Sequence, residues 1–322
     1  MCRLYVRIDT ANEFIASPSL KVDHVHLKVS NLHEAVEFYQ SILGFTVLGI
    51  DSGRDLAYLG LAESISDKSS ALLVLDQVNR GKNVYSTNMK RREAGLYHFA
   101  ILLPERKFLS YFLRHIQENL DPQFYEGMAD HAVSESIYLH DPDYNGIEVY
   151  RDRKPSEWKW LGENKVHMVT EPLDVDNLLS QYRDKIWIGF PVHTSIGHVH
   201  LHVSNLAKAK KFYHQLLGLY HTASYPGAYF FAADNYHHHV ATNTWIGTNI
   251  LPSSADDPNK PGLEHYAIRI TGDIEEFNRL KRHLTTNDIA IDEDIENLNE
   301  QNDTSFYIYD SDGVKIQILL SK

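Results

Sequence analysis

The segment GHVHLHVSNL at residues 197–206 repeats the earlier segment DHVHLKVSNL at residues 23–32. The offset is constant, because His198 follows His24 at the same spacing as Asn205 follows Asn31. Each copy continues into an amphipathic stretch that ends in Leu-Gly, at residues 43–44 and 217–218. Self-similarity at a fixed spacing indicates an internal duplication. Because a histidine begins the first predicted strand of each copy, the duplication also points to the chemistry.

Length and charge limit the classes of function that the chain supports. It has 322 residues, which is enough for two domains with full cores. Its net charge is −12, from 43 acidic and 31 basic residues, so nucleic acids and anionic membranes are poor candidate partners. Cys2 is the single cysteine and no leader or membrane-spanning run is evident, so we expect a cytoplasmic protein. The chain has 19 histidines, many of which are clustered, with several at predicted strand starts.

The first half of the chain reads as two units of one strand, one helix and further strands. The alternating pattern over residues 22–29 predicts a strand, the spacing over 32–43 predicts a helix, and 56–61 and 71–75 read as strands. In the second unit, residues 95–102 predict a strand and 108–116 a helix. The unit ends in strands at 137–140 and 147–150 around the turn DPDYNG at 141–146.

The second half repeats this order, with a third unit over residues 196–246 and a fourth over 262–320. We therefore predict an N-terminal extension (1–20), a first domain of two units (21–151), a linker (152–195) and a second domain of two units (196–322). The linker is polar and contains one short helical pattern near residues 175–182.

Four such units in two pairs resemble the vicinal oxygen chelate superfamily, which includes glyoxalases, bleomycin-resistance proteins and extradiol dioxygenases. The resemblance spans about residues 20–320, and the segments at 95–104, 130–148 and 236–239 are most similar to bacterial two-domain catechol 2,3-dioxygenases. The fold it implies is α+β, with four βαβββ modules arranged as two paired-module half-barrels. Tyr144 departs from the family, whose turn has glycine at that position.

The resemblance implies a metal site of two histidines and one carboxylate, with the histidines on first strands and the carboxylate on a last strand. Glu148 is the available carboxylate, because the equivalent position of the fourth unit is Gln317. A buried glutamate without a partner is costly, which also favours a bound ion at Glu148. We expect His98, Glu148 and His198 to be the ligands, since units two and three together supply the full residue set of the family. The alternative third ligand is His24 of the first unit.

The other histidines have less direct expected roles. His200 and His202 alternate with His198 along one strand, so they face the same side and are expected to line the cavity. At most one or two of residues 237–239 can serve the site. His24 and His265 are interpreted as a degenerate, structural counterpart opposite Gln317.

The resemblance implies an extradiol dioxygenase that uses Fe(II), with Mn(II) as the alternative metal. Its partners would be a small aromatic diol and O2, and its product from catechol would be 2-hydroxymuconic semialdehyde, as in aromatic hydrocarbon catabolism. His238 would act as the base, and His131 and Tyr138 would bind the substrate oxygens. Asp130 and Glu135 are weaker candidates for orienting these imidazoles. A homo-oligomer is compatible with this function.

Two other functions remain open from the sequence. A glyoxalase-type isomerase or lyase usually needs a further carboxylate in the last strand of the third unit, and residues 236–246 contain neither Asp nor Glu. A non-catalytic small-molecule-binding protein of this superfamily would usually lack the metal ligands, whereas this chain retains a complete set.

Overall fold

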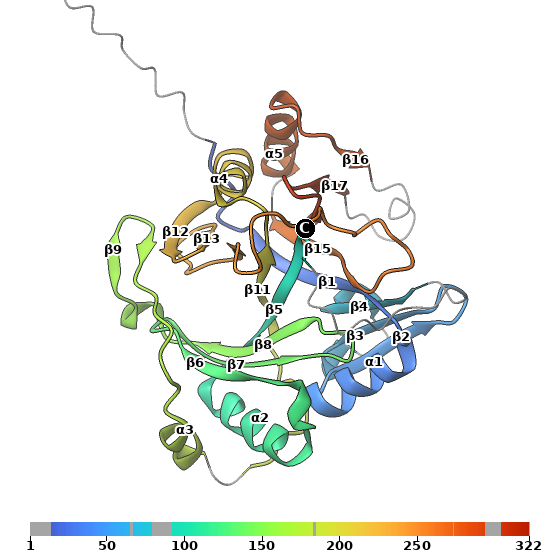
Figure 1. Ribbon diagram of the computed structural model, residues 1–322, viewed down its shortest axis with the longest axis vertical. Coiled ribbons are helices and arrows are strands. Elements are labelled where there is room, and N and C mark those ends of the chain that lie inside the picture. The colour runs from blue at the N-terminus through green and yellow to red at the C-terminus, as the bar shows by residue number, and fades with distance from the viewer. Residues whose placement is uncertain are drawn as a thin grey trace, which may run out of the picture.

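The structure is a computed structural model that describes residues 14–64, 67–78, 92–182, 185–272, 274–293 and 304–321. Cys2 and most of the predicted N-terminal extension lie outside the described residues. Two eight-stranded sheets form the centre of the molecule (Figure 1).

Each sheet is formed by two units that meet through antiparallel first strands. One sheet has the order β16 (Asp292–Glu293), β17 (Ser305–Tyr309), β18 (Lys315–Ser321), β15 (Gly262–Thr271), β1 (Lys21–Val29), β4 (Leu73–Gln77), β3 (Leu56–Gly60) and β2 (Thr46–Asp51). The other has the order β12 (Tyr220–Tyr225), β13 (Ala228–Ala232), β14 (Val240–Asn243), β11 (Ser195–His202), β5 (Gly95–Leu103), β8 (Gly146–Asp152), β7 (Ser134–His140) and β6 (Tyr125–Asp130). The predicted α+β fold of four modules in two half-barrels is confirmed.

The pairing of the units is one with four and two with three, because β1 pairs with β15 and β5 pairs with β11. Every sheet therefore takes one unit from each half of the chain. The domain boundaries proposed from the sequence stay a prediction. Within the predicted linker, the chain forms the short hairpin β9 (Trp160–Gly162) and β10 (Lys165–Val166), followed by α3 (Val175–Gln181).

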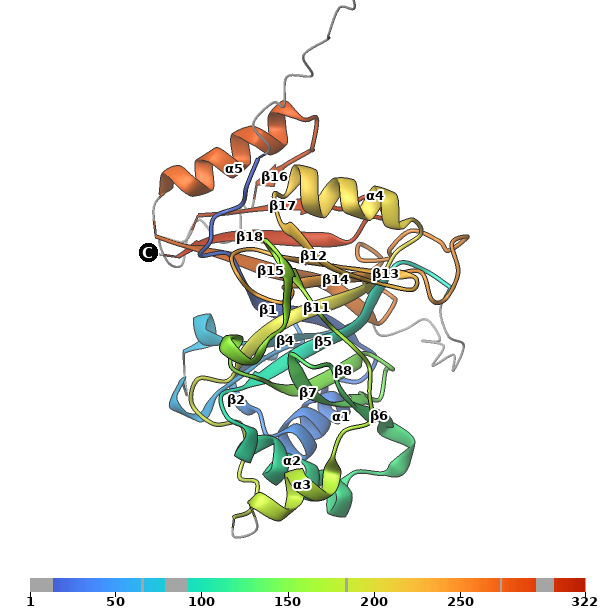
Figure 2. The ribbon, with the colours of Figure 1, turned by 90° about the vertical axis from the view of Figure 1, so that its left-hand side faces the viewer.

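The helices of the two halves lie on opposite sides of the strands. Figure 2 shows α1 (Leu32–Phe38), α2 (Arg106–Asn119) and α3 on one side, and α4 (Leu206–Lys210) and α5 (Ile274–Thr286) on the other. Short 3₁₀ turns occupy Ala62–Ser64, Lys68–Ser70, Pro122–Phe124 and Pro155–Glu157. No helix of the described segments is both long and apolar enough to cross a membrane.

The helices of the first and third units are built alike. Asn31 and Asn205 cap α1 and α4 through their side-chain oxygens, which accept hydrogen bonds from backbone N–H groups of the first turn. Each helix then widens into a π-helical turn, at Tyr39–Leu43 and Lys211–Leu216. Gly44 ends the π-helical turn at Tyr39–Leu43, and its φ of 97° is one that glycine adopts readily. The predicted helix over 32–43 is thus present, with its last turn widened.

A tyrosine–aspartate hydrogen bond joins the two units of each half. The hydroxyl of Tyr39 donates to Asp141 over 2.8 Å, and the hydroxyl of Tyr213 donates to Asp310 over the same distance. Both aspartates begin the turns between the last two strands of units two and four, and the backbone of each turn folds around its carboxylate. The predicted turn chemistry therefore also holds neighbouring units together.

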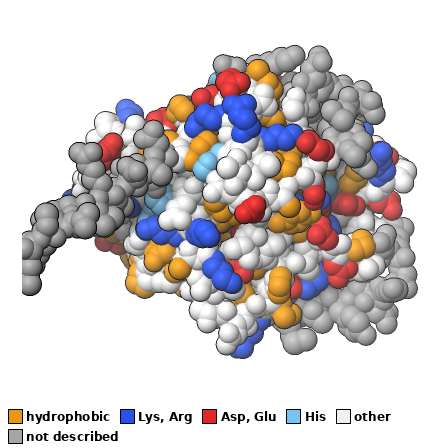
Figure 3. All heavy atoms as spheres, turned by 90° about the horizontal axis from the view of Figure 1, so that it is seen from above, with side chains coloured by type: hydrophobic (Ala, Val, Ile, Leu, Met, Phe, Trp, Pro, Cys, Tyr) orange, Lys and Arg blue, Asp and Glu red, His pale blue; other side chains and the backbone are white. Residues whose placement is uncertain are grey.

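Tyr144, at the position where the family turn has glycine, adopts φ of 64°. Its exposed ring stacks on His140 with centroids 4.4 Å apart, and this contact holds a non-glycine residue in the left-handed region. On the face of the molecule seen in Figure 3, acidic and basic side chains are interspersed.

Candidate metal centre

One large cavity, of about 1060 Å³, opens over the sheet formed by units two and three. The rim includes aromatic side chains, among them Tyr97, Tyr225 and Trp245, each of which is more than one third exposed. The deep part is polar and is formed by buried side chains from β5, β8 and β11 and from the segment that precedes β14. Its buried histidines and carboxylate are His98, Glu148, His198, His200 and His238.

Three of these side chains converge on one point. The Nε2 atoms of His98 and His198 lie 3.0 Å and 3.1 Å from the same oxygen of Glu148, Oε2. All three side chains are at least nine-tenths buried. They form a group whose ligand atoms lie within 4.8 Å of one another.

The strand register explains why these three side chains meet. β5 and β11 run antiparallel and place His98 opposite His200, one alternation from His198. β8 runs parallel to β5 on its other side and places Glu148 opposite Ala100. Side chains that point to the same face of three adjacent strands therefore supply the group.

Gly146 allows this close approach of β8 to β5. A Cβ atom at that position would lie 1.9 Å from the carbonyl oxygen of Tyr97, next to His98. Any larger residue would push the two strands apart where the first imidazole and the carboxylate meet.

The second oxygen of Glu148 is held by a neighbouring strand. The hydroxyl of Ser136, on β7, donates a hydrogen bond of 2.6 Å to Oε1. Burial by itself would raise the pKa of Glu148, but the hydrogen-bonded contacts with His198 and His98 lower it well below its usual value. Glu148 is therefore a carboxylate anion with one oxygen fixed and the other directed at two imidazoles.

The donor set fits a divalent transition metal. Nε2 of His98 is buried and has no hydrogen-bond partner of good geometry among the described residues, although it lies beside Oε2. An orphaned imidazole nitrogen is costly unless a cation or a proton satisfies it. Burial lowers the pKa of His198 to about 4, so its ring is in the neutral state that metal ligands require. Two imidazoles and one carboxylate suit Fe(II), Mn(II) and similar ions and leave further positions open.

Two residues expected to contact substrate lie beside this group. Nδ1 of His131 donates a hydrogen bond to the carbonyl oxygen of Val169 over 2.7 Å. With its ring proton on Nδ1, His131 accepts a hydrogen bond at Nε2 from the hydroxyl of Tyr138 over 2.6 Å. The phenol oxygen of Tyr138 then has lone pairs free to accept a proton from a bound hydroxyl. His131 and Tyr138 both line the cavity.

His200 and His202 also line the cavity, as the alternation along their strand predicts. The side chain of Asn243 joins them, because its amide nitrogen donates to Nε2 of His200 over 3.0 Å and its oxygen accepts from Nδ1 of His202 over 2.8 Å. No sequence pattern indicated a role for Asn243, which lies at the end of β14.

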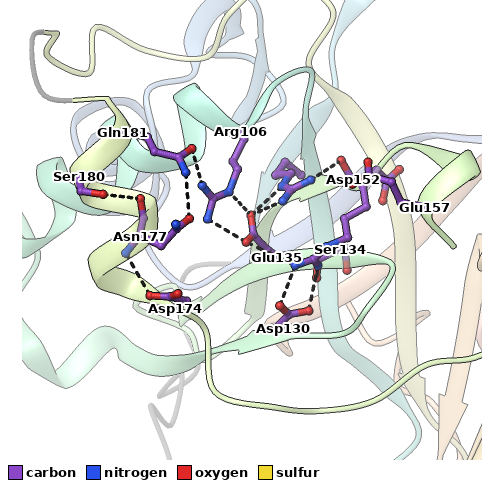
Figure 4. A network of polar contacts seen from close by, with 12 residues as sticks. Arg106, Asp130, Ser134, Glu135, Asp152, Glu157, Asp174, Asn177, Ser180 and Gln181 are labelled. Atoms are coloured by element: carbon purple, nitrogen blue, oxygen red, sulfur yellow. Dashed lines mark hydrogen bonds and ion pairs between the residues drawn. The ribbon is translucent and has the colours of Figure 1, made fainter.

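The expectation that Asp130 and Glu135 orient imidazoles is wrong. Both carboxylates are bound by arginines and not by imidazoles (Figure 4). Glu135 accepts hydrogen bonds from Arg106 and Arg151, and Asp130 accepts two from Arg153. The arginines come from α2 and β8 and from the residue after β8, so local sequence around Asp130 and Glu135 does not reveal the pairing.

The alternative ligand His24 lies on β1, in the sheet formed by units one and four, where Nδ1 is 2.7 Å from Asp23. In that sheet His26, Glu264 and His265 form a second group of ligand-type side chains. The Nζ atom of Lys315 lies 2.7 Å from Glu264. Lys315 precedes Gln317 by two residues, as Gly146 precedes Glu148. The sheet of units one and four therefore has a lysine at the position where the sheet of units two and three has Gly146.

Three residues that the sequence analysis did not identify as functional form hydrogen bonds with site residues or with each other next to the site. They are Ser136, His237 and Asp152. Alternation along residues 237–239 indicated that only some of these histidines face the cavity, and the structure places His238 there. His237 lies behind it and contacts Asp152.

Comparisons with known proteins agree with this architecture. The profile of the Glyoxalase/Bleomycin resistance protein/Dioxygenase superfamily matches residues 21–149 and 195–318. A protein of Bacillus subtilis (strain 168) named catechol-2,3-dioxygenase is 38% identical over 249 residues, which are 77% of this chain and 81% of the relative.

Solved structures show the same fold at low identity. Glyoxalase I from Zea mays superposes with a TM-score of 0.53 at 16% identity, covering 94% of this chain and 92% of the maize chain. A Bacillus subtilis protein provisionally described as a dioxygenase has a TM-score of 0.59 at 10% identity, covering 95% and 86% of the two chains. These structures support the fold alone.

Proposed function

Because the chain belongs to the Glyoxalase/Bleomycin resistance protein/Dioxygenase superfamily, we propose that it is an extradiol dioxygenase. In this proposal it cleaves catechol or a substituted catechol with O2, and catechol gives 2-hydroxymuconic semialdehyde. The observation that carries the proposal is the convergence of His98 and His198 on one oxygen of Glu148 inside the cavity.

His98, Glu148 and His198 would hold Fe(II). The bound ion would supply acidification of the catechol hydroxyls and a route for electrons from catechol to O2. Because the hydroxyl of Ser136 occupies Oε1, Glu148 would offer Oε2 to the ion and leave positions open for substrate and O2.

The remaining side chains handle protons and orientation. His238 lines the cavity, and burial lowers its pKa well below the usual value, so its ring is neutral and can accept a proton from a catechol hydroxyl. Tyr138, oriented by His131, accepts or donates at the other substrate oxygen. The aromatic rim provides apolar surface for the ring of the substrate.

A glyoxalase-type reaction receives less support from this chain. That chemistry usually needs a further carboxylate on the last strand of unit three, and β14 (Val240–Asn243) carries none. A non-catalytic binding role does not account for the three converging ligands.

The test is anaerobic loading with Fe(II), followed by catechol and then air. We expect a yellow product that absorbs in the near ultraviolet. Absence of product from every catechol tried, together with conversion of a hemithioacetal, would instead support the glyoxalase function.

Glu148→Gln tests the metal ligand, because glutamine already occupies the equivalent position 317. We expect iron content to fall to background and activity to fall by more than the ~100-fold typical of changes to residues that merely support a ligand. The circular dichroism spectrum should not change. The matched control, Gln317→Ala, should keep both iron and activity, and iron retained in Glu148→Gln at wild-type level would contradict the ligand assignment.

A further inference from the structure

A chain of hydrogen bonds leads from β8 to His238. Asp152 lies four residues after Glu148, on the same face of β8, and its Oδ1 is 2.8 Å from Nε2 of His237. Nδ1 of His237 is in turn 2.7 Å from Nδ1 of His238. β8 therefore carries both Glu148, the proposed metal ligand, and Asp152, the first residue in this series of hydrogen bonds.

Both carboxylate oxygens of Asp152, the first residue in this series of hydrogen bonds, have hydrogen-bond partners. The hydroxyl of Tyr236 donates to Oδ2 of Asp152 over 2.9 Å, and Tyr150 donates to Tyr236 over 2.8 Å. The ring of His237 is fully buried and packs against Trp158 at 5.3 Å. Neither Asp152 nor His237 can turn away without leaving a buried polar group unpaired.

The direction of each bond follows from the chemistry of its ends. An ionised carboxylate can only accept hydrogen bonds. Nε2 of His237 therefore carries a proton and donates a hydrogen bond to Asp152. With its ring proton on Nε2, His237 has a lone pair on Nδ1, and this lone pair accepts a hydrogen bond from the N–H at Nδ1 of His238. In neutral His238 the other nitrogen, Nε2, is left without a proton.

We propose that Asp152 and His237 are positioning residues that fix the tautomer of His238, so that its unprotonated Nε2 faces the cavity as a hydrogen-bond acceptor. The use of that acceptor as a base toward catechol rests on the proposed function. The tautomer itself does not, and it can be measured without any turnover.

The first measurement is the tautomer of His238 in the full-length protein. ¹⁵N-histidine labelling with Zn(II) in the site gives a diamagnetic sample, and a His238→Asn sample assigns the signals. We expect a protonated Nδ1 and an unprotonated Nε2 at His238. A proton on Nε2 in the wild type would overturn the proposal whether or not the protein cleaves catechol.

The second measurement uses variants of Asp152 and His237, which change the hydrogen bonds to His238 but do not line the cavity. In Asp152→Asn the amide can donate to Nε2 of His237, which reverses both bonds and puts the proton of His238 on Nε2. We expect kcat to fall by about 10²- to 10⁴-fold, the contribution of a well-placed general base, with KM and metal content unchanged. His237→Phe removes the acceptor and should give a similar loss.

His237→Asn provides the rescue, because its side-chain oxygen can still accept from Nδ1 of His238. We expect it to keep the tautomer and to recover most of the kcat that His237→Phe loses. The matched control is His239→Asn, since His239 is also buried and is adjacent to His238 in sequence but does not take part in the hydrogen bonds from Asp152 to His238. Wild-type tautomer and kcat in both Asp152→Asn and His237→Phe would refute the positioning role.

Discussion

At the scale of single residues, the hydroxyl of Ser136 decides how many oxygens Glu148 offers to an ion. Its hydrogen bond of 2.6 Å occupies Oε1 and leaves Oε2 to face the two imidazoles. A carboxylate freed from this bond can rotate or bind an ion through both oxygens, which would close a position that substrate or O2 needs. Hydrogen bonds of this kind orient a ligand and tune its affinity.

Ser136→Ala should therefore weaken metal binding by about 10- to 100-fold while the fold is retained. Competition with a chromophoric chelator measures this affinity directly. The control is Ser110→Ala, because Ser110 is also buried but lies on α2, away from Glu148. Equal affinities in wild type and Ser136→Ala would show that the hydroxyl has no part in orienting the carboxylate.

Single residues were predictable where the duplication made them comparable. Gln317 at the position of Glu148 identified which carboxylate to examine, and the structure places His98 and His198 beside it. Asp130 and Glu135 were misjudged because their partners, Arg106, Arg151 and Arg153, are selected by the tertiary fold. His237 was passed over for the same reason, since its partner Asp152 is distant in sequence.

At the scale of elements, the turns between the last two strands of units two and four carry buried aspartates. Burial, followed by the nearby charge of Asp143, raises the pKa of Asp141 to about 6 from an ordinary value of 3.8. Burial likewise raises the pKa of Asp310 to about 6. Each carboxylate accepts several hydrogen bonds, but these do not fully offset the cost of burying its charge.

The sign of the pH effect follows from this shift. Between about pH 4 and pH 6 the folded protein holds a proton on Asp141 that the unfolded chain has lost, so folding stability from this group falls as pH rises. Two pKa units correspond to about 3 kcal/mol. Asp141→Asn removes this term, so the difference in unfolding free energy between wild type and variant should shrink from pH 4 to pH 7.

Urea unfolding at several pH values measures that difference. Asp310→Asn should show the same trend, because Asp310 has equivalent partners. It accepts hydrogen bonds from Tyr213 and from the backbone of its own turn, as Asp141 does from Tyr39 and the backbone of the turn in unit two. A pH-independent difference for both variants would mean that neither aspartate is protonated in the folded protein below pH 6.

Elements were predictable where their pattern is strong and local. The central strands and the amphipathic helices follow from alternation and helical spacing, but the edge strands β2 and β6 were not identified. β2 contains Gly49 and β6 contains Gly127, and each has a register shift at its glycine, so neither shows an unbroken alternation. Strand patterns also do not reveal how the units pair, because the apolar pattern of a first strand does not identify its partner strand. Only the completeness of the residue set in units two and three indicated the pairing.

At the scale of the whole molecule, the proposed metal site lies across the seam between the two halves of the chain. His98 and Glu148 come from the first half, on β5 and β8, and His198 comes from the second half, on β11. An ion bound to all three would cross-link the halves in the folded state and lose its geometry on unfolding. Binding to the folded state alone stabilises a protein by an amount set by ligand concentration and affinity.

Fe(II) added anaerobically should therefore raise the melting temperature of the whole chain. At a free concentration 100 times the dissociation constant, the gain is about 2.7 kcal/mol, which corresponds to a rise of about 5 °C for a protein of this size. Glu148→Gln should abolish the rise, and Gln317→Ala, in the sheet where Lys315 already pairs with Glu264, should retain it in full. Calorimetry distinguishes the cases: an increase of equal size in Glu148→Gln would place the stabilising ion away from the seam, and a loss of the increase in Gln317→Ala would place it in the sheet of units one and four.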